Sequence, residues 1–316
     1  MVSTIPTKEA IELAAQRIEP FVHRTPVVTS HFLDTLSGAR IYLKCENLQK
    51  IGAFKIRGAT NAALQLSKAE QQKGLTTHSS GNHAQAVALT AKNLGTKAFI
   101  VMPENAPAVK KAAVADYGAE IIFCKPTLEA REKTLSEVVK RTGATFLHPY
   151  DNPEIIVGQA TCAKELLEDT PALDIIMAPV GGGGLLSGTA LSAHYFSPAT
   201  EVIAVEPEGA DDAFRSFEAG KIIPSQNPKT IADGLLTSLG TINFPIIQQF
   251  VSEIMLVNDV EIVEAMRYLY ERVKLVVEPS AAVPLAALLK HPDRFQGKSV
   301  GIVLSGGNVD LSKLPF

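Results

Sequence analysis

The chain has 316 residues, of which 46% are hydrophobic and 20% charged, and its formal net charge is −3. This length and composition indicate a folded protein with two domains and exclude a disordered chain. Because both signs of charge are interspersed, there is no electrostatic reason to expect nucleic acid or a membrane surface as a partner.

The cysteines and the first residues indicate a cytoplasmic location. Cys45, Cys124 and Cys162 match neither a disulfide framework nor a metal-ligand spacing, so we expect reduced thiols. The N-terminus lacks the basic start and apolar block of a signal peptide. No apolar run is long enough to span a bilayer. We therefore expect a cytoplasmic protein without a membrane partner.

The predicted elements form two alternating series. Apolar spacing first predicts a helix around 11–18, a strand over 40–45 and a helix over 58–66. The next series consists of strands 75–79, 97–102, 120–124 and 144–148 and helices 82–94, 107–116 and 127–141. The last consists of strands 174–180, 201–207 and 299–305, helices ending near 194 and 217, and a long helix over 259–275. Such alternation predicts an α/β fold whose two domains each have a mostly parallel sheet flanked by helices.

Four consecutive glycines, Gly181 to Gly184, follow a buried-looking strand and precede a helix. Their backbone N–H groups can converge on an anion at the helix N-terminus. The lysine of a P-loop is missing because Thr189 follows Gly188, and the dinucleotide fingerprint fails in every register. The stretch therefore indicates a phosphate-binding loop for a small monoester, or alternatively a tight strand-to-helix turn.

Two further segments each have a purely structural interpretation and a functional one. The loop from Ser79 to His83 could bind a carboxylate, or Ser80 or Asn82 could simply cap the next helix. Lys55, between Phe54 and Ile56, could keep its amine in water or could be desolvated. A desolvated lysine has a lowered pKa and attacks aldehydes. A reactive lysine and a lysine-free phosphate loop together predict pyridoxal phosphate as the cofactor.

Four separated motifs make the sequence similar to fold-type II pyridoxal phosphate enzymes, which have a tryptophan synthase beta-like fold. The motifs are 54–59, 79–83, 181–184 and 305–308, in the family's order. The branch that the chain resembles is that of serine racemases and serine/threonine dehydratases, including threo-3-hydroxyaspartate dehydratases. The resemblance implies a large cofactor domain (1–73 and 151–316), a small mobile domain (74–150) and a homodimer. We expect no appended regulatory domain.

The resemblance also assigns the cofactor contacts. Lys55 matches the lysine that bonds to the cofactor aldehyde, while Phe54 and Gly234 match the residues on the two faces of the ring. Asn82 matches the partner of the 3-hydroxyl group, and Ser305 that of the pyridine nitrogen. A neutral hydroxyl at Ser305 makes the ring a weaker electron sink than a carboxylate would, which suits elimination. The implied phosphate site comprises Gly181, Gly182, Gly183, Gly184 and Leu185.

For the reaction, the resemblance implies that Lys55 removes the Cα proton of a hydroxy amino acid and that water is then lost, giving a 2-oxo acid and ammonia. The implied substrate-binding residues are Ser79, Ser80, Gly81, Asn82 and His83. Ser80 matches the second acid–base group of the racemases, where many threonine dehydratases have alanine. We therefore expect a serine racemase that also dehydrates serine and threonine. The alternative is a threo-3-hydroxyaspartate dehydratase or a catabolic threonine dehydratase.

A cation site is implied by the segment after the strand 201–207. Glu206, Asp212 and the carbonyl of Ala210 match the racemase ligands to Mg²⁺, Mn²⁺ or Ca²⁺, and such oxygen ligands suit hard cations. Alternatively, the acidic residues only favour a helix N-terminus.

Two positions depart from the racemase pattern, and two other classes of protein stay open. Ile51 replaces a threonine of the nucleotide effector site in animal serine racemases, so we do not expect ATP activation. Tyr150 replaces an asparagine near the substrate and resembles the dehydratases. A nucleotide-binding module would not need Lys55. A β-replacement enzyme such as a cysteine synthase would not need Ser80 or the acidic segment.

Overall fold

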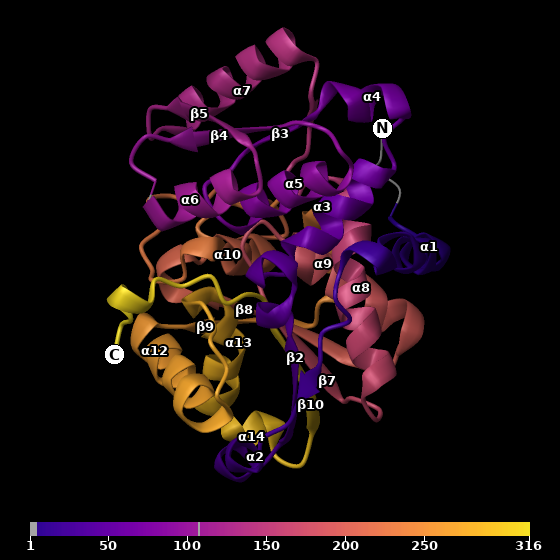
Figure 1. Ribbon diagram of the computed structural model, residues 1–316. Coiled ribbons are helices and arrows are strands. Elements are labelled where there is room, and N and C mark those ends of the chain that lie inside the picture. The colour runs from indigo at the N-terminus through magenta and orange to yellow at the C-terminus, as the bar shows by residue number, and fades with distance from the viewer. Residues whose placement is uncertain (1–4, 107) are drawn as a thin grey trace.

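The computed structural model describes residues 5–106 and 108–316, which form two β-sheets with helices packed against them (Figure 1). The larger sheet has the order β1-β2-β10-β7-β8-β9 and the smaller one β5-β4-β3-β6. All neighbouring strands are parallel except β1 and β2. The strands are β1 (Val27–Val28), β2 (Arg40–Cys45), β3 (Leu75–His78), β4 (Ala98–Pro103), β5 (Glu120–Cys124), β6 (Thr145–Phe146), β7 (Ile175–Pro179), β8 (Glu201–Pro207), β9 (Glu253–Val257) and β10 (Ser299–Leu304).

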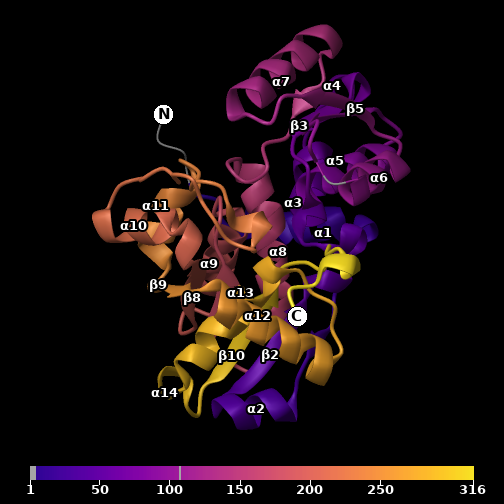
Figure 2. The same ribbon diagram turned by 90° about the vertical axis from the view of Figure 1, so that its left-hand side faces the viewer.

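Helices cover both faces of the smaller sheet. α7 (Leu128–Thr142) lies above it in Figure 1, and α5 (Asn82–Asn93) and α6 (Ala108–Asp116) lie below it. Local sequence sets the ends of α7, because Thr127 caps its first turn and Gly143, at φ +71°, ends it. Figure 2 shows from the side that this sheet and its helices stand above the rest of the molecule.

The larger sheet is also covered on both faces, which explains the unbroken apolar stretches of its central strands. α12 (Asp259–Tyr268) and α13 (Pro279–Lys290) share one apolar core with the sheet, while Cys162 and Leu166 of α8 pack into another. The other helices are α1 (Lys8–Ile18), α2 (His31–Ser37), α3 (Lys55–Leu64), α4 (Lys68–Lys73), α8 (Pro153–Asp169), α9 (Gly184–Phe196), α10 (Asp212–Ala219), α11 (Asn243–Phe250) and α14 (Pro292–Phe295). None of the helices in the described parts of the chain is long and apolar enough to cross a membrane.

The topology brings the predicted motifs to one edge. β2, β10, β7 and β8 are mutually parallel, so their carboxyl ends meet on the same side of the larger sheet. The chain after each of them carries a predicted motif: Lys55 after β2, Ser305 after β10, the glycines after β7 and Asp212 after β8. Open parallel sheets bind their ligands at this edge.

Several expected elements differ from the structure. The helix expected over 58–66 is α3, which already begins at Lys55, and the strand expected over 144–148 is only Thr145–Phe146. The helix expected over 259–275 is present as one helical stretch over 259–273, but its geometry changes: α12 ends at Tyr268, a π-helical turn over Leu269–Val273 continues it directly, and it stops at Lys274, where φ is +67°. The first residue of the helix expected over 107–116 lies outside the described residues.

Eight helices and strands were not anticipated: β1, α2, α4, α8, α11, β9, α13 and α14. The reason is clear for α8 and α13, because they are buried on nearly all sides and so lack the polar face that reveals an amphipathic helix. The division at residues 74 and 150 and the mobility of the smaller part stay predictions. The two sheets agree with the division, since β3 to β6 lie within 75–146.

Candidate active site

The predicted motifs meet through direct contacts between loops. The backbone N–H of Phe54 donates to the carbonyl of Ser305 (3.1 Å), and Ala53 pairs with Gly306. Lys55 Nζ donates to the carbonyl of Pro149, which follows β6 of the smaller sheet (2.8 Å). These contacts place Lys55 between the ends of β10 and β6.

Lys55 is half-buried, and its amine has no counter-charge among the described residues. It lies at the first position of α3, 5.1 Å from the centre of the Phe54 ring, and its hydrogen bond is to a neutral carbonyl. No carboxylate of the described residues lies within ion-pair distance of it. Burial lowers the pKa of Lys55 to about 8, and the carboxyl of Glu278 opposes this only in part. An amine of this kind is neutral, and therefore nucleophilic, at lower pH than a solvated lysine.

The glycine loop is closely covered, so side chains cannot replace its hydrogens. A Cβ atom at Gly182 would lie 2.3 Å from the Tyr150 ring, and one at Gly181 would lie 3.0 Å from Cα of Leu235. Gly183 has φ +94°, a conformation that favours glycine, and it is the N-cap of α9. The loop therefore leaves the N–H groups at the start of α9 without side-chain caps, which suits a phosphate group.

The same contacts bring in the remaining predicted cofactor residues. The carbonyl of Gly234 lies 3.3 Å from the Cβ position of Gly181, and Gly234 N–H donates to Ser280 Oγ (3.0 Å). Leu185, the second residue of α9, is buried, and Phe54 packs against the same apolar cluster. The lysine, the glycine loop, Gly234 and Ser305 thus surround one site.

Asn82 has an unexpected environment. It is the first residue of α5, and Gly81 is the N-cap, so the interpretation of Ser80 or Asn82 as a simple helix cap is wrong. Instead, Asn82 Nδ2 donates to both carboxylate oxygens of Glu278 (2.9 and 3.1 Å). Burial raises the pKa of Glu278 to about 7, although the Asn82 hydrogen bond opposes the shift.

Ser79, Gly81 and His83 make their hydrogen bonds within the part of the chain that carries the smaller sheet. Ser79 Oγ accepts from Gly81 N–H (3.3 Å), while Ser80 and Gly81 remain half-buried. His83 Nε2 donates to the carbonyl of Leu147 (2.9 Å), and burial, with Lys55 nearby, lowers the pKa of His83 to about 3. His83 is therefore neutral and orients the loop rather than acting as a base.

A cluster of charged side chains surrounds Arg57, two residues after Lys55, and its charges are paired. Arg57 is completely buried, and its guanidinium donates to both oxygens of Glu46 (2.8 Å each) and both of Glu165 (2.7 and 2.8 Å). Lys44 donates to Glu165 as well (2.7 Å). Burial opposes the charge of Arg57, but the attraction and hydrogen bonds of Glu46 and Glu165 together outweigh it and hold the pKa of Arg57 above its ordinary range. This cluster fixes the first turn of α3, so Arg57 is structural.

The predicted metal ligands also come together. Glu206, at the end of β8, is buried and accepts from the N–H groups of Ala213 and Phe214 (2.9 Å each). Asp212 begins α10, and its Oδ1 atom is buried with no hydrogen-bond partner among the described residues. Burial raises the pKa of Glu206 to about 9 and that of Asp212 to about 6. The charge of Arg215 opposes the pKa shift of Asp212 only in part, and Ala210 lies buried between the two carboxyls in sequence.

Sequence reasoning missed the roles of Glu278 and Asn308. Both residues stand in stretches that the resemblance covers, but neither has a local pattern that reveals its partner. Asn308 Nδ2 donates to Asn82 Oδ1 (2.8 Å), a contact between residues 226 positions apart. Only the fold brings such residues together.

Two mostly parallel sheets flanked by helices, an amine between them that has no counter-charge among the described residues, and a glycine loop at a helix N-terminus are the features expected of a fold-type II pyridoxal phosphate enzyme. The comparisons agree. The family model described as "Pyridoxal-phosphate dependent enzyme" matches residues 18–306, and the chain belongs to this family. Pyridoxal phosphate is its cofactor, and the fold predicted from the sequence is confirmed.

Within this family, the chain is similar to serine racemases and to a hydroxyaspartate dehydratase. A beta-hydroxyaspartate dehydratase from Paracoccus denitrificans is 50% identical over 99% of both chains. A serine racemase from Dictyostelium discoideum is 47% identical over 98% of this chain and 96% of its own. The structure of maize serine racemase matches with a TM-score of 0.95 and 45% identity, covering 98% of this chain and 95% of that one.

Proposed function

We propose that the protein is a serine racemase that also eliminates water from hydroxy amino acids, giving a 2-oxo acid and ammonia. The observation that carries the proposal is the half-buried, uncompensated Lys55 amine beside Asn82, Ser305 and the glycine loop. The similarity to serine racemases over nearly the whole chain supports it.

The residue roles follow from the contacts. Pyridoxal phosphate, when bound, supplies an aldehyde for the amine and a conjugated ring that withdraws electron density from Cα. The N–H groups from Gly181 to Leu185 would hold the phosphate, and the Ser305 hydroxyl would be the partner of the pyridine nitrogen. The neutral Lys55 amine accepts the Cα proton on one face of the substrate. General base catalysis of this kind typically contributes about 10²- to 10⁴-fold.

Ser80 supplies the second acid–base group, on the opposite face. Ser80 lies in the loop between β3 and α5, two residues before α5 begins, and this position supports the role. Racemisation needs a group on both faces of Cα, whereas elimination of water needs only Lys55. Ser80→Ala should therefore abolish formation of D-serine while 2-oxo acid release from L-serine continues.

The neighbouring change Ser79→Ala is the matched control, because it alters the same loop without removing the second base. It should lower both products by a similar factor. If Ser80→Ala also lowers both products equally, the two-base assignment is wrong.

We infer further that Glu206, Asp212 and the Ala210 carbonyl bind a divalent cation. The buried Oδ1 of Asp212, without a partner among the described residues, supports this site. A cation there would support the segment between β8 and α10. Titration calorimetry with Mg²⁺ should show one site per chain. Glu206→Gln should remove it, and exposed Glu208→Gln should not.

A second candidate activity is dehydration of 3-hydroxyaspartate, and one observation favours it. Arg131 Nε is buried with no hydrogen-bond partner among the described residues. The pKa of His78 is lowered by burial first and by the charge of Arg131 second, so the two side chains lie close together. From His78 a series of rings, Phe146 (5.5 Å), His148 (5.6 Å) and Tyr150 (4.7 Å), leads to the glycine loop.

A guanidinium whose Nε has no partner among the described residues suits a substrate with a second carboxylate. Arg131→Met should then raise KM for 3-hydroxyaspartate by about tenfold or more and leave that for serine nearly unchanged. Exposed Lys133→Met on the same helix is the control. Equal effects on both substrates would exclude this role.

Two further expectations remain proposals: assembly into a homodimer, which the resemblance implies, and a cytoplasmic location, which the cysteines and the first residues indicate. Light scattering on the purified protein tests the first, and fractionation of the source cells tests the second.

A further inference from the structure

The amide of Asn82 is held on both sides by residues of the larger domain. Its Nδ2 faces Glu278, and its Oδ1 accepts from Asn308 Nδ2 (2.8 Å). An amide group has one acceptor oxygen and two donor hydrogens. One N–H shared between the two oxygens of Glu278 accounts for both of those contacts. With Oδ1 bound to Asn308, the second hydrogen of Asn82 is then the group left for a ligand.

The orientation of Asn308 is itself dictated by the backbone. Asn308 Nδ2 also donates to the carbonyl of Ile51 (2.7 Å). A backbone carbonyl can only accept, so Asn308 must turn its NH₂ group toward Ile51. The second hydrogen of that NH₂ group is donated to Asn82, which must therefore accept it with its Oδ1 atom. One carbonyl thus sets the orientation of two amides in succession.

The Ile51 carbonyl is presented by unusual backbone. Ile51 has φ +62°, which is rare for a β-branched residue and persists only where surrounding contacts enforce it. Ile51 is buried among apolar residues of α3 and α5, and Gly52, at φ +67°, accepts from Gly307 N–H (2.8 Å). A Cβ atom at Gly52 would lie 2.8 Å from Asn308 Oδ1. The turn before Lys55 and the turn after β10 therefore fit each other closely at Asn308.

From this geometry we propose that Asn308 is a positioning residue, which turns the NH₂ group of Asn82 toward the 3-oxygen of the cofactor. The inference rests on the proposed site, in which Asn82 faces that oxygen. Without Asn308, the Asn82 amide can rotate and present its oxygen instead, which would repel an ionised 3-oxygen.

The test uses the absorbance of the purified holoenzyme rather than its activity. A hydrogen bond to the 3-oxygen favours the ionised ring form, which absorbs in the visible. Asn308→Ala should shift intensity from the visible band to the near-ultraviolet band. It should also weaken binding of pyridoxal phosphate to the cofactor-free protein by roughly tenfold.

Asn308→Asp sharpens the test, because it has nearly the same shape but cannot donate to Asn82. It should shift the absorbance at least as far as the alanine variant, and it serves as the second variant if Asn308→Ala does not fold. Asn258→Ala is the matched control: Asn258 caps α12 away from this site, so its loss should lower stability without altering the band ratio.

A double variant shows whether Asn308 acts through Asn82. In an Asn82→Ala background, Asn308→Ala should cause no additional shift in the band ratio. A wild-type band ratio and cofactor affinity in both Asn308 variants would overturn the inference. If borohydride still attaches the cofactor to Lys55 in those variants, the proposed function stands; if it attaches nothing to Lys55 in the wild type, the proposed function itself is wrong.

Discussion

Lys55 and Arg57 lie two residues apart in the first turn of α3, and both are cations in the interior, yet their surroundings are opposite. Arg57 makes hydrogen bonds to both oxygens of Glu46 and of Glu165. Lys55 has a single neutral partner, the carbonyl of Pro149. The pKa of Arg57 is accordingly raised by Glu46, whereas burial lowers the pKa of Lys55 to about 8.

The difference distinguishes a scaffold from a site. A buried charge whose hydrogen bonds are all satisfied can hold a structure in one arrangement but has no free group for chemistry. A buried polar group without a suitable partner costs stability, so it is retained where a ligand completes it. By this criterion Arg57, Glu46 and Glu165 form the support, whereas we infer functional roles for Lys55 and Asp212.

The largest expected effect is the loss of activity when Lys55 is replaced. Lys55→Ala should remove the visible absorbance of the holoenzyme and lower 2-oxo acid release by at least about 10⁴-fold, because it removes both nucleophile and base. The free energy of unfolding should change by only about 1 kcal/mol, since no charge is left unpaired. Exposed Lys68→Ala is the control and should change neither quantity. Retained activity would contradict the account.

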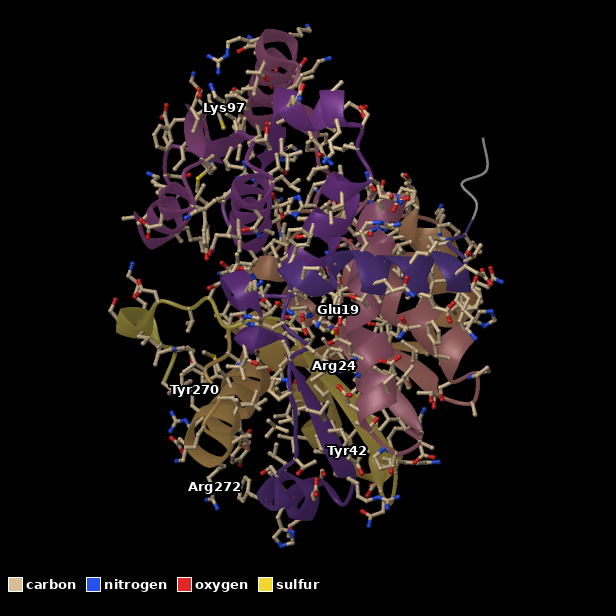
Figure 3. The ribbon with its side chains drawn as sticks, turned by 45° about the vertical axis from the view of Figure 1, so that its right-hand side comes forward. Glu19, Arg24, Tyr42, Lys97, Tyr270 and Arg272 are labelled. Atoms are coloured by element: carbon tan, nitrogen blue, oxygen red, sulfur yellow. The ribbon has the colours of Figure 1, made fainter. Side chains whose placement is uncertain are left out.

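The next effect concerns stability. Arg57→Met should lower the free energy of unfolding by about 3–5 kcal/mol, because it leaves Glu46 buried without its counter-charge. Urea denaturation of the holoenzyme measures this. The control is Arg24→Met: Arg24 lies beside α8 (Figure 3) and pairs with Glu168 and Asp169 at the surface. That change should cost at most about 1 kcal/mol. Similar losses in both variants would show that the buried cluster is not the support.

A smaller effect tests the Lys55 amine itself. In the cofactor-free protein, labelling of Lys55 by an amine-specific reagent should rise with pH and reach half its maximum near pH 8. The sign follows from burial, which disfavours the ammonium form, so the reactive neutral amine appears at lower pH. Peptide mapping gives the labelling of each lysine, with Lys313, 80% exposed, as reference. Labelling of both lysines over the same pH range would contradict the comparison.

The sequence predicted most of the smaller sheet, because its helices keep a polar face and its glycines mark the helix ends. Gly95, Gly118 and Gly143 all have positive φ at those ends. It did not predict α8 or α13, whose buried surroundings leave no periodicity to detect. For the same reason the boundary of α3 was set too late, since Lys55 and Arg57 are polar residues that are nonetheless inside the protein.

For the site, the sequence identified the groups that act through local motifs. Lys55, the glycine loop and Ser305 follow strands, and parallel strands necessarily bring such segments to one edge. The contacts of Glu278 and Asn308 with Asn82 could not be foreseen, because they join residues about 200 positions apart. Nor could the left-handed backbone at Ile51, since that residue type rarely adopts it.

The most direct test of the central claim is to find where the cofactor is attached. Borohydride reduction of fully loaded enzyme, followed by proteolysis and mass spectrometry, should place a pyridoxyl group on Lys55 and on no other lysine. Lys110, which pairs with Asp233 beside Gly234, is the informative comparison within the same digest. A pyridoxyl group on Lys110 or elsewhere, with Lys55 unmodified, would contradict the account.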